Sequence, residues 1–127
     1  MEPYIIEPTD DSPKIHFDKS SGIFEISGRS LPEEVIKFYT PVLQWIDNYS
    51  MEPNDITIVK LKLLYFNSAS QRSLLEVLTG FEKILQTSKK ITVEWYYLED
   101  DEDMKESGEE YEDLVDIPFK FITYVPE

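Results

Sequence analysis

The stretch Asp55–Asn67, DITIVKLKLLYFN, decides the fold class. It is rich in β-branched and large apolar residues, and these occupy both odd and even positions. Such a run indicates a β-strand that is covered on both faces, as in the centre of a parallel sheet. Lys60 and Lys62 interrupt the run; each either marks a part of the strand outside its helical cover or extends its charged end to water along an apolar stem. An amphipathic helix is expected to begin at Ser68, directly after the strand.

The residues before this strand predict an N-terminal hairpin. Met1–Pro13 contains three prolines and few apolar groups, and is expected to form an extended lead-in. Lys14–Lys19 and Gly22–Arg29 each alternate apolar with polar residues and flank a Ser-Ser-Gly turn. This pattern is typical of a β-hairpin.

A first helix is predicted between the hairpin and the Asp55–Asn67 strand. Ser30 is the expected N-cap, with Pro32 in the first turn and Glu33 at the capping-box position. Apolar residues then recur at three- and four-residue spacing as far as Tyr49. Pro41 lies within this pattern and is expected to kink the helix.

The residues after Ser68 predict a second crossover and the end of the sheet. The second helix is expected to end near Lys89 and to lead into a strand at Ile91–Leu98. Glu109–Val115 has some helical character, and a last strand is expected at Phe119–Val125. The predicted order is β-β-α-β-α-β-(α)-β: one α/β domain over residues 1–127, with a mixed, mostly parallel sheet, an N-terminal hairpin and two to three helices.

The charge of the chain is concentrated in one segment. The net charge is −14, and Glu99–Asp113 holds ten carboxylates and one lysine, a net of −9. This segment is expected to be a solvated acidic loop. The acidity argues against nucleic acid and anionic membranes as partners, because both require clustered lysine and arginine. No apolar run approaches the ~20 residues that a membrane helix needs, so a cytoplasmic location is expected.

Residues for catalysis, metal binding or cofactor binding are sparse. The absence of cysteine excludes disulfides, thiolate zinc sites and a cysteine nucleophile. His16 is the only histidine and is expected to be a surface or structural residue, and the four glycines do not form a phosphate-binding loop. Asp100–Asp103 lacks the spacing of an EF-hand calcium loop. We therefore expect no metal, no cofactor and no enzymatic activity.

The strand-to-helix junction is the strongest candidate site. In open α/β sheets, ligands and partners usually bind at the carboxyl ends of the strands. Ser68 and Gln71 have capping-box spacing, so Ser68 is first of all expected to cap the helix. A phosphate on Ser68 would also be tolerated there, because the helix N-terminus attracts negative charge. The expected partner-binding residues are Tyr65, Phe66, Asn67, Ser68, Ala69, Ser70 and Gln71.

Several segments together resemble the SiaC family of bacterial regulatory phosphoproteins, formerly a domain of unknown function. The resemblance covers nearly the whole chain. It is carried by the segments Glu7-Pro8-Thr9, Pro13–Asp18, Gly22–Glu33, Phe38–Ile46 and Tyr65–Ser70.

This resemblance implies a fold similar to the STAS domains of anti-sigma-factor antagonists and a role in partner switching. Family members act with a SiaB-like protein kinase and a PP2C-type phosphatase, and the unphosphorylated form binds and activates a diguanylate cyclase in cyclic-di-GMP and biofilm control. The resemblance places the phosphoacceptor on Ser68, where the family has threonine, with Ser70 as the fallback. Two other functions stay open: a constitutive acidic interaction module or anti-sigma-factor-antagonist-like protein, and a small hydrolase that uses His16.

Overall fold

Six strands form one sheet in which they lie side by side in the order of the chain, β1-β2-β3-β4-β5-β6. A computed structural model describes residues 1–125. The strands are β1 (Tyr4–Ile6), β2 (Lys14–Asp18), β3 (Ile23–Ser30), β4 (Ile56–Phe66), β5 (Lys90–Leu98) and β6 (Phe119–Tyr124). The helices are α1 (Val35–Met51), α2 (Ser68–Glu82), the short 3₁₀ helix η1 (Lys83–Gln86) and α3 (Glu102–Leu114). The predicted mixed α/β fold is confirmed.

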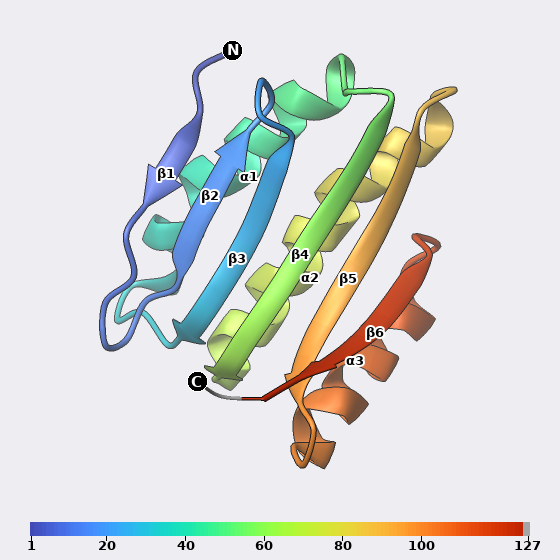
Figure 1. Cartoon of the computed structure of the whole chain (residues 1–127). Coiled ribbons are helices and arrows are strands. Elements are labelled where there is room, and N and C mark those ends of the chain that lie inside the picture. Colours follow the sequence, from blue (N-terminus) through green and yellow to red (C-terminus); the bar gives the residue numbers. More distant parts are fainter. Residues whose placement is uncertain (126–127) are drawn as a thin grey trace.

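The helices cover only one face of the sheet (Figure 1). β3 to β6 are parallel neighbours, whereas β1 and β2 pair antiparallel at one edge. Each parallel crossover advances by one strand in the same direction, and because such crossovers are right-handed, all the connecting helices lie on the same side. The prediction that β4 is covered on both faces is therefore wrong. Val59 and Leu61 point into the core, whereas Ile58 and Leu64 remain 38% and 49% exposed on the open face.

Lys62 lies on this open face and does not disturb the core. Its ammonium group lies 4.5 Å from the centroid of the Tyr124 ring and 5.9 Å from that of Tyr96. At these distances a cation is attracted to the electron-rich face of an aromatic ring. The open face thus carries lysine and tyrosine side chains beside the exposed apolar residues Ile58 and Leu64.

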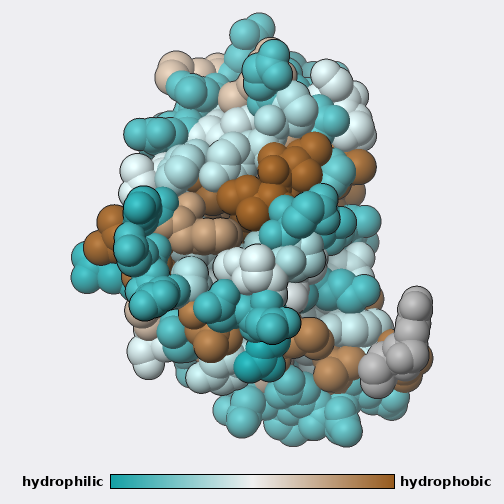
Figure 2. Space-filling model, turned by 90° about the vertical axis from the view of Figure 1, so that its left-hand side faces the viewer, coloured by the Kyte–Doolittle hydropathy of each residue, from teal (hydrophilic) through white to brown (hydrophobic). Residues whose placement is uncertain are grey.

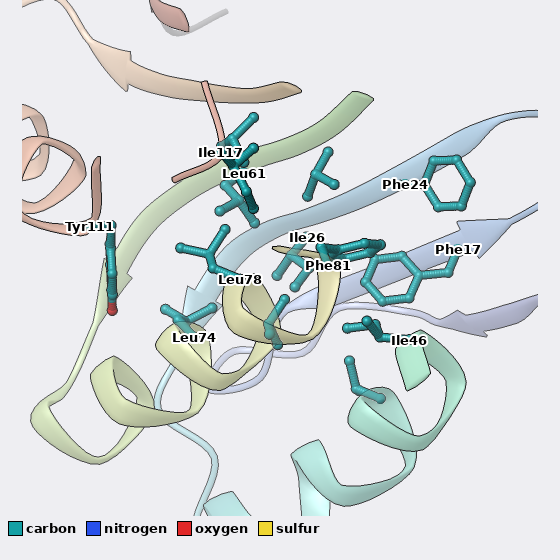
Figure 3. Packing of buried hydrophobic residues seen from close by; sticks show 14 of the residues in the cluster. Phe17, Phe24, Ile26, Ile46, Leu61, Leu74, Leu78, Phe81, Tyr111 and Ile117 are labelled. Atoms are coloured by element: carbon teal, nitrogen blue, oxygen red, sulfur yellow. The ribbon is translucent and has the colours of Figure 1, made fainter. Parts of the chain in front are cut away.

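The core lies between the covered face of the sheet and helices α1 and α2 (Figure 3). Leu74, Leu78 and Phe81 project from α2 toward the strands. The Phe81 ring meets the Phe17 ring nearly edge-on, with the centroids 5.7 Å apart. Ile46 of α1 is fully buried beside them. Side chains of the predicted hairpin and the two predicted helices therefore meet in one hydrophobic core.

Two predictions at the N-terminal end need correction. The lead-in Met1–Pro13 contains a strand, β1, whose residues Tyr4–Ile6 pair with Ile15–Phe17 of β2. Ser30 is not an N-cap; it is the last residue of β3, and α1 begins only at Val35, after Glu34. Glu33 therefore does not form a capping box.

The acidic segment Glu99–Asp113 is a helix rather than a loop for most of its length. The Asp101 side chain accepts a hydrogen bond of 3.0 Å from the Met104 backbone N–H, which caps the start of α3. Met104 and Tyr111 are buried against the sheet while the carboxylates face water. The Trp95 indole N–H donates to the Met104 carbonyl oxygen at 2.9 Å and fixes α3 above β5.

The side of the molecule that carries β1 and α1 has a mixed surface (Figure 2). Apolar side chains gather around a hollow in its middle and are bordered by hydrophilic residues. Exposed apolar residues of the two elements include Ile5, 49% exposed, and Ile36, 76% exposed. None of the helices described in residues 1–125 combines the length and apolar character needed to cross a membrane.

Candidate functional site

The carboxyl ends of β3 and β4 meet the start of α2 at one end of the sheet (Figure 1). Ser30 and Phe66 are paired in the last register of the two strands. The Asn67 backbone N–H then donates to the Ser30 carbonyl oxygen at 3.2 Å. This bond ties the first residue after β4 to the end of β3, so the start of α2 has a fixed position.

Asn67, and not Ser68, caps helix α2. The Asn67 Oδ1 atom accepts a 2.9 Å hydrogen bond from the Ser70 N–H, and the Asn67 carbonyl accepts one of 3.0 Å from the Gln71 N–H. Asparagine is among the best N-cap residues because its side chain satisfies a free N–H of the first turn. The predicted capping box between Ser68 and Gln71 is thus wrong, and the Ser68 hydroxyl has no capping role.

The two serines considered as phosphoacceptors lie in opposite environments. Ser68 is an exposed residue in the first turn of α2. Ser70 is 0% exposed, and its hydroxyl accepts a 2.9 Å hydrogen bond from the Ser30 hydroxyl. An enzyme can reach Ser70 in the folded chain only if α2 is displaced. Of the two serines, Ser68 is therefore the one whose hydroxyl is accessible in this conformation.

A buried chain of hydroxyl groups lies beneath Ser68. The Tyr39 hydroxyl from α1 lies 2.6 Å from the Ser30 hydroxyl, which in turn donates to Ser70. The chain links α1, the end of β3 and the start of α2. Removing one hydroxyl from such a chain is expected to lower the free energy of unfolding, because it leaves a buried polar group without its hydrogen-bond partner.

Replacement of Tyr39 by phenylalanine is expected to lower the free energy of unfolding by about 1–2 kcal/mol at neutral pH. Burial raises the pKa of Tyr39 from 10.0 to about 12, against a smaller lowering by the hydrogen bond with Ser30. The folded chain thus retains this proton more tightly than the unfolded chain. The stabilisation that comes from the protonated Tyr39 hydroxyl is complete below pH 10 and is lost as the pH rises toward 12.

Urea unfolding between pH 8 and pH 11 measures this effect. The wild-type protein should lose more stability over this range than Tyr39→Phe. Equal losses of stability in the two proteins would show that ionisation of Tyr39 does not contribute to the loss of stability at high pH.

Two grooves border Ser68. The first, here called the α1–α2 groove, has a volume of about 620 Å³ and is lined by Val35, Tyr39, Leu43, Ser68, Arg72 and Glu76, among others. The second, the α3 groove, has a volume of about 470 Å³, and its lining includes Phe66, Ser68, Gln71, Asp101, Asp103 and Glu110. The α1–α2 groove combines apolar side chains with one arginine and one glutamate, whereas the α3 groove carries three carboxylates and no lysine or arginine.

α3 contacts the candidate site through Tyr111. The Tyr111 hydroxyl donates to the Gln71 carbonyl oxygen at 2.7 Å, and its ring lies 6.2 Å from that of Phe66. Burial is the main cause that raises the pKa of Tyr111, so this hydroxyl stays protonated and able to donate. The acidic helix is thereby fixed beside the first turn of α2.

The predicted partner-binding residues lie together at this junction but differ in exposure. Tyr65, Ser68, Ala69 and Gln71 are exposed, Phe66 and Asn67 are half-buried, and Ser70 is buried. The Arg29 guanidinium lies over the exposed Tyr65 ring, 5.5 Å from its centroid. Sequence reasoning missed Arg72 and the carboxylates of α3. Arg72 could have been found by its spacing of four residues from Ser68, whereas the carboxylates required the position of α3.

His16 lies on the opposite side of the sheet from this strand-to-helix junction. It lies on β2 between the buried residues Ile15 and Phe17, so it occupies the open face, and its cross-strand partners are Ile5 and Glu25. α2 and Ser68 belong to the layer on the other face (Figure 1). Within residues 1–125, no group of three or more histidine or acidic residues has a geometry that could hold a metal ion.

The sequence matches the family described as SiaC family regulatory phosphoprotein over residues 6–124. The chain belongs to the SiaC family. An uncharacterised protein of Pseudomonas aeruginosa strain UCBPP-PA14 is 25% identical over 114 residues, which cover 90% of each chain.

Two solved structures share the fold of this SiaC family member. The crystal structure of apo-SiaC from Pseudomonas aeruginosa has a TM-score of 0.86 and 24% identity, covering 97% of this chain and 100% of that chain. A chain in the crystal structure of the diguanylate cyclase SiaD in complex with its activator SiaC, also from Pseudomonas aeruginosa, has a TM-score of 0.88 and 24% identity. That match covers 95% of this chain and 99% of the other.

Proposed function

We propose that this protein is a non-enzymatic signalling phosphoprotein that changes partners when Ser68 is phosphorylated. The observation that carries the proposal is the contrast between the two serines of the first turn: Ser68 is exposed between two grooves, whereas Ser70 is buried. Membership of a family of regulatory phosphoproteins supports a modified hydroxyl. Asn67 already caps the helix, so phosphorylation of Ser68 sacrifices no native hydrogen bond of its side chain.

The modification is a phosphoryl transfer that needs a separate kinase. The Ser68 hydroxyl oxygen forms a bond to the γ-phosphorus of ATP, the bond to the bridging oxygen breaks, ADP leaves and the hydroxyl proton passes to a base of the kinase. A phosphatase reverses the change when water attacks the phosphorus, which restores serine and releases inorganic phosphate. A SiaB-like kinase and a PP2C-type phosphatase are the proposed enzymes.

The proposed partner surface is the exposed part of the strand-to-helix junction. Tyr65, Ala69 and Gln71 surround Ser68 and are exposed. A partner that covers them must also cover Ser68. A phosphate of about −1.5 to −2 charges at this position would then have to be desolvated in the interface, which is unfavourable unless the partner supplies cations.

The proposed effector is a diguanylate cyclase. A SiaC protein of the same fold is the activator in a complex with the cyclase SiaD. By analogy, the unphosphorylated form of this chain binds and activates a cyclase of its own host and so controls cyclic-di-GMP and biofilm formation. A cytoplasmic location is part of this proposal.

In the native host, Ser68→Ala is expected to abolish the slower-migrating form of the protein on a gel that retards phosphoproteins. The wild-type protein should show two bands whose ratio changes with growth conditions. Ser107→Ala provides a matched control, since Ser107 also lines the α3 groove. This control should keep both bands.

Two results would contradict the assignment. A retarded band that persists in Ser68→Ala and disappears in another variant moves the acceptor to that residue. The lack of any retarded wild-type band under all growth conditions, with the proposed kinase expressed, removes the switch altogether.

A further inference from the structure

The surroundings of Ser68 are electrically asymmetric. On the α3 side, Asp101, Asp103 and Glu110 line the groove that Ser68 borders. On the α1 side, the groove contains Arg72, with Glu76 one turn further along. A negative group attached to Ser68 is therefore repelled from the α3 groove and attracted toward Arg72 in the α1–α2 groove.

Arg72 is free to receive such a group. It lies four residues after Ser68 on the same helix, a spacing that puts two side chains on one face with about 5–6 Å between their Cβ atoms. Throughout residues 1–125, no carboxylate oxygen lies within 4.0 Å of its guanidinium, although Glu76 lines the same groove. Arg29, the other arginine of the chain, is instead stacked over Tyr65 and lines neither groove.

We infer that Arg72 binds the phosphate on Ser68 and holds it in the α1–α2 groove, an inference that rests on the proposed phosphorylation of Ser68. A guanidinium suits this role because its planar N–H groups can donate two parallel hydrogen bonds to a phosphate. Bound in this way, the phosphate points away from α3.

A phosphate held by Arg72 closes the α1–α2 groove and not the α3 groove. The side chains that α1 contributes to the α1–α2 groove are mostly apolar and include Val35 and Leu43. A dianion held by Arg72 fills the mouth of this groove and makes it unsuitable for an apolar side chain. The α3 groove keeps its shape and its carboxylates. Phosphorylation thus changes the surface between α1 and α2 and leaves that between α2 and α3 nearly as it was.

The second pKa of the phosphate tests the inference directly. Phosphoserine is placed at position 68 by genetic code expansion, and the phosphate is titrated by phosphorus NMR in the full chain. Its pKa, ordinarily about 6, is expected to be higher by about 0.5 unit in Arg72→Gln than with Arg72 present, a roughly threefold change in proton affinity. In the variant, Glu76, Asp101, Asp103 and Glu110 remain and favour the protonated phosphate.

Two further variants make the outcome specific. Arg72→Lys keeps the positive charge and is expected to retain part of the effect, and Arg29→Gln removes the same charge nearby and should leave the pKa unchanged. Because Arg72 is exposed, circular dichroism should show the native fold in every variant. The difference should shrink in 1 M NaCl, where the Debye length is about 3 Å.

The possible outcomes separate this inference from the proposed function. An unchanged pKa in Arg72→Gln, or equal rises in Arg72→Gln and Arg29→Gln, overturns the role of Arg72. Neither result bears on whether a kinase modifies Ser68 or whether a partner responds. If the pKa rises only in Arg72→Gln but the host never phosphorylates Ser68, the role of Arg72 stands and the proposed switch fails.

Discussion

Gly108→Ala is expected to destabilise the protein by about 2 kcal/mol, although alanine is the better helix former. A Cβ atom at position 108 would lie 2.6 Å from two atoms of the Trp95 ring and 2.8 Å from an atom of the Phe121 ring. Both rings belong to the sheet and cannot move freely. The added methyl group must therefore push α3 away and strain the bond between the Trp95 indole and the Met104 carbonyl.

Urea unfolding, followed by tryptophan fluorescence, measures this loss. Glu109→Ala is the matched control: it lies next to Gly108 on α3 but is exposed, and should change the stability by no more than about 0.5 kcal/mol. Hydrogen exchange should also be faster in α3 of Gly108→Ala than in the control. A Gly108→Ala protein as stable as the wild type would contradict the close packing of α3 on β5 and β6.

A phosphate on Ser68 is expected to weaken binding of the diguanylate cyclase about 100-fold, which corresponds to about 2.7 kcal/mol. The cost arises because a partner that covers Tyr65, Ala69 and Gln71 also covers the phosphate and removes its water. Arg72 offsets part of the charge but fills the α1–α2 groove in doing so. Most of the loss should appear as faster dissociation, as is usual for changes within an interface.

Calorimetric titration of the cyclase with the two forms of the protein measures the affinity. Phosphoserine at position 88 serves as the control, because Ser88 is exposed and follows η1 at the opposite end of α2. It adds the same charge to the same chain and should leave the affinity within about twofold, a difference of about 0.4 kcal/mol. Equal weakening by both phosphates would mean that net charge, and not the Ser68 edge, controls binding.

The sequence of β4 predicts a strand but not how many of its faces are covered. Apolar residues at both parities suggested cover on both sides, yet Ile58 and Leu64 lie on the open face. The number of covered faces depends on the strand order, and a sheet whose parallel strands follow each other in one direction has all its helices on one side. Lys60 and Lys62 were the local signal of an open face.

The sequence predicted helical character only for Glu109–Val115, the later part of α3 (Glu102–Leu114), because the charge of the segment conceals its apolar stripe. Met104, Gly108, Tyr111 and Val115 are buried and follow each other at spacings of four, three and four residues, as expected for one face of a helix. Ten carboxylates in Glu99–Asp113 dominate the composition, so the segment reads as a solvated loop. The stripe also includes a glycine, which contributes no apolar side chain although its position is buried.

The candidate site could be located from the sequence, but its chemistry could not be assigned in full. The strand-to-helix junction and Ser68 follow from local pattern. The choice between Asn67 and Ser68 as N-cap depends on backbone geometry, which places Asn67 Oδ1 against the Ser70 N–H. Ser70, unlike Ser68, is buried, and its hydroxyl contacts that of Ser30, forty residues away in the chain. Such contacts are set by tertiary packing.

Cyclase output with the two forms of the protein tests the central claim most directly. Purified cyclase from the host is assayed for cyclic-di-GMP with the unmodified protein, with the protein carrying phosphoserine at position 68, and with that form after treatment with the phosphatase. The unmodified protein should activate the cyclase, the phosphorylated protein should not, and the phosphatase should restore activation. Equal cyclase activity with the modified and unmodified forms would contradict a switch at Ser68.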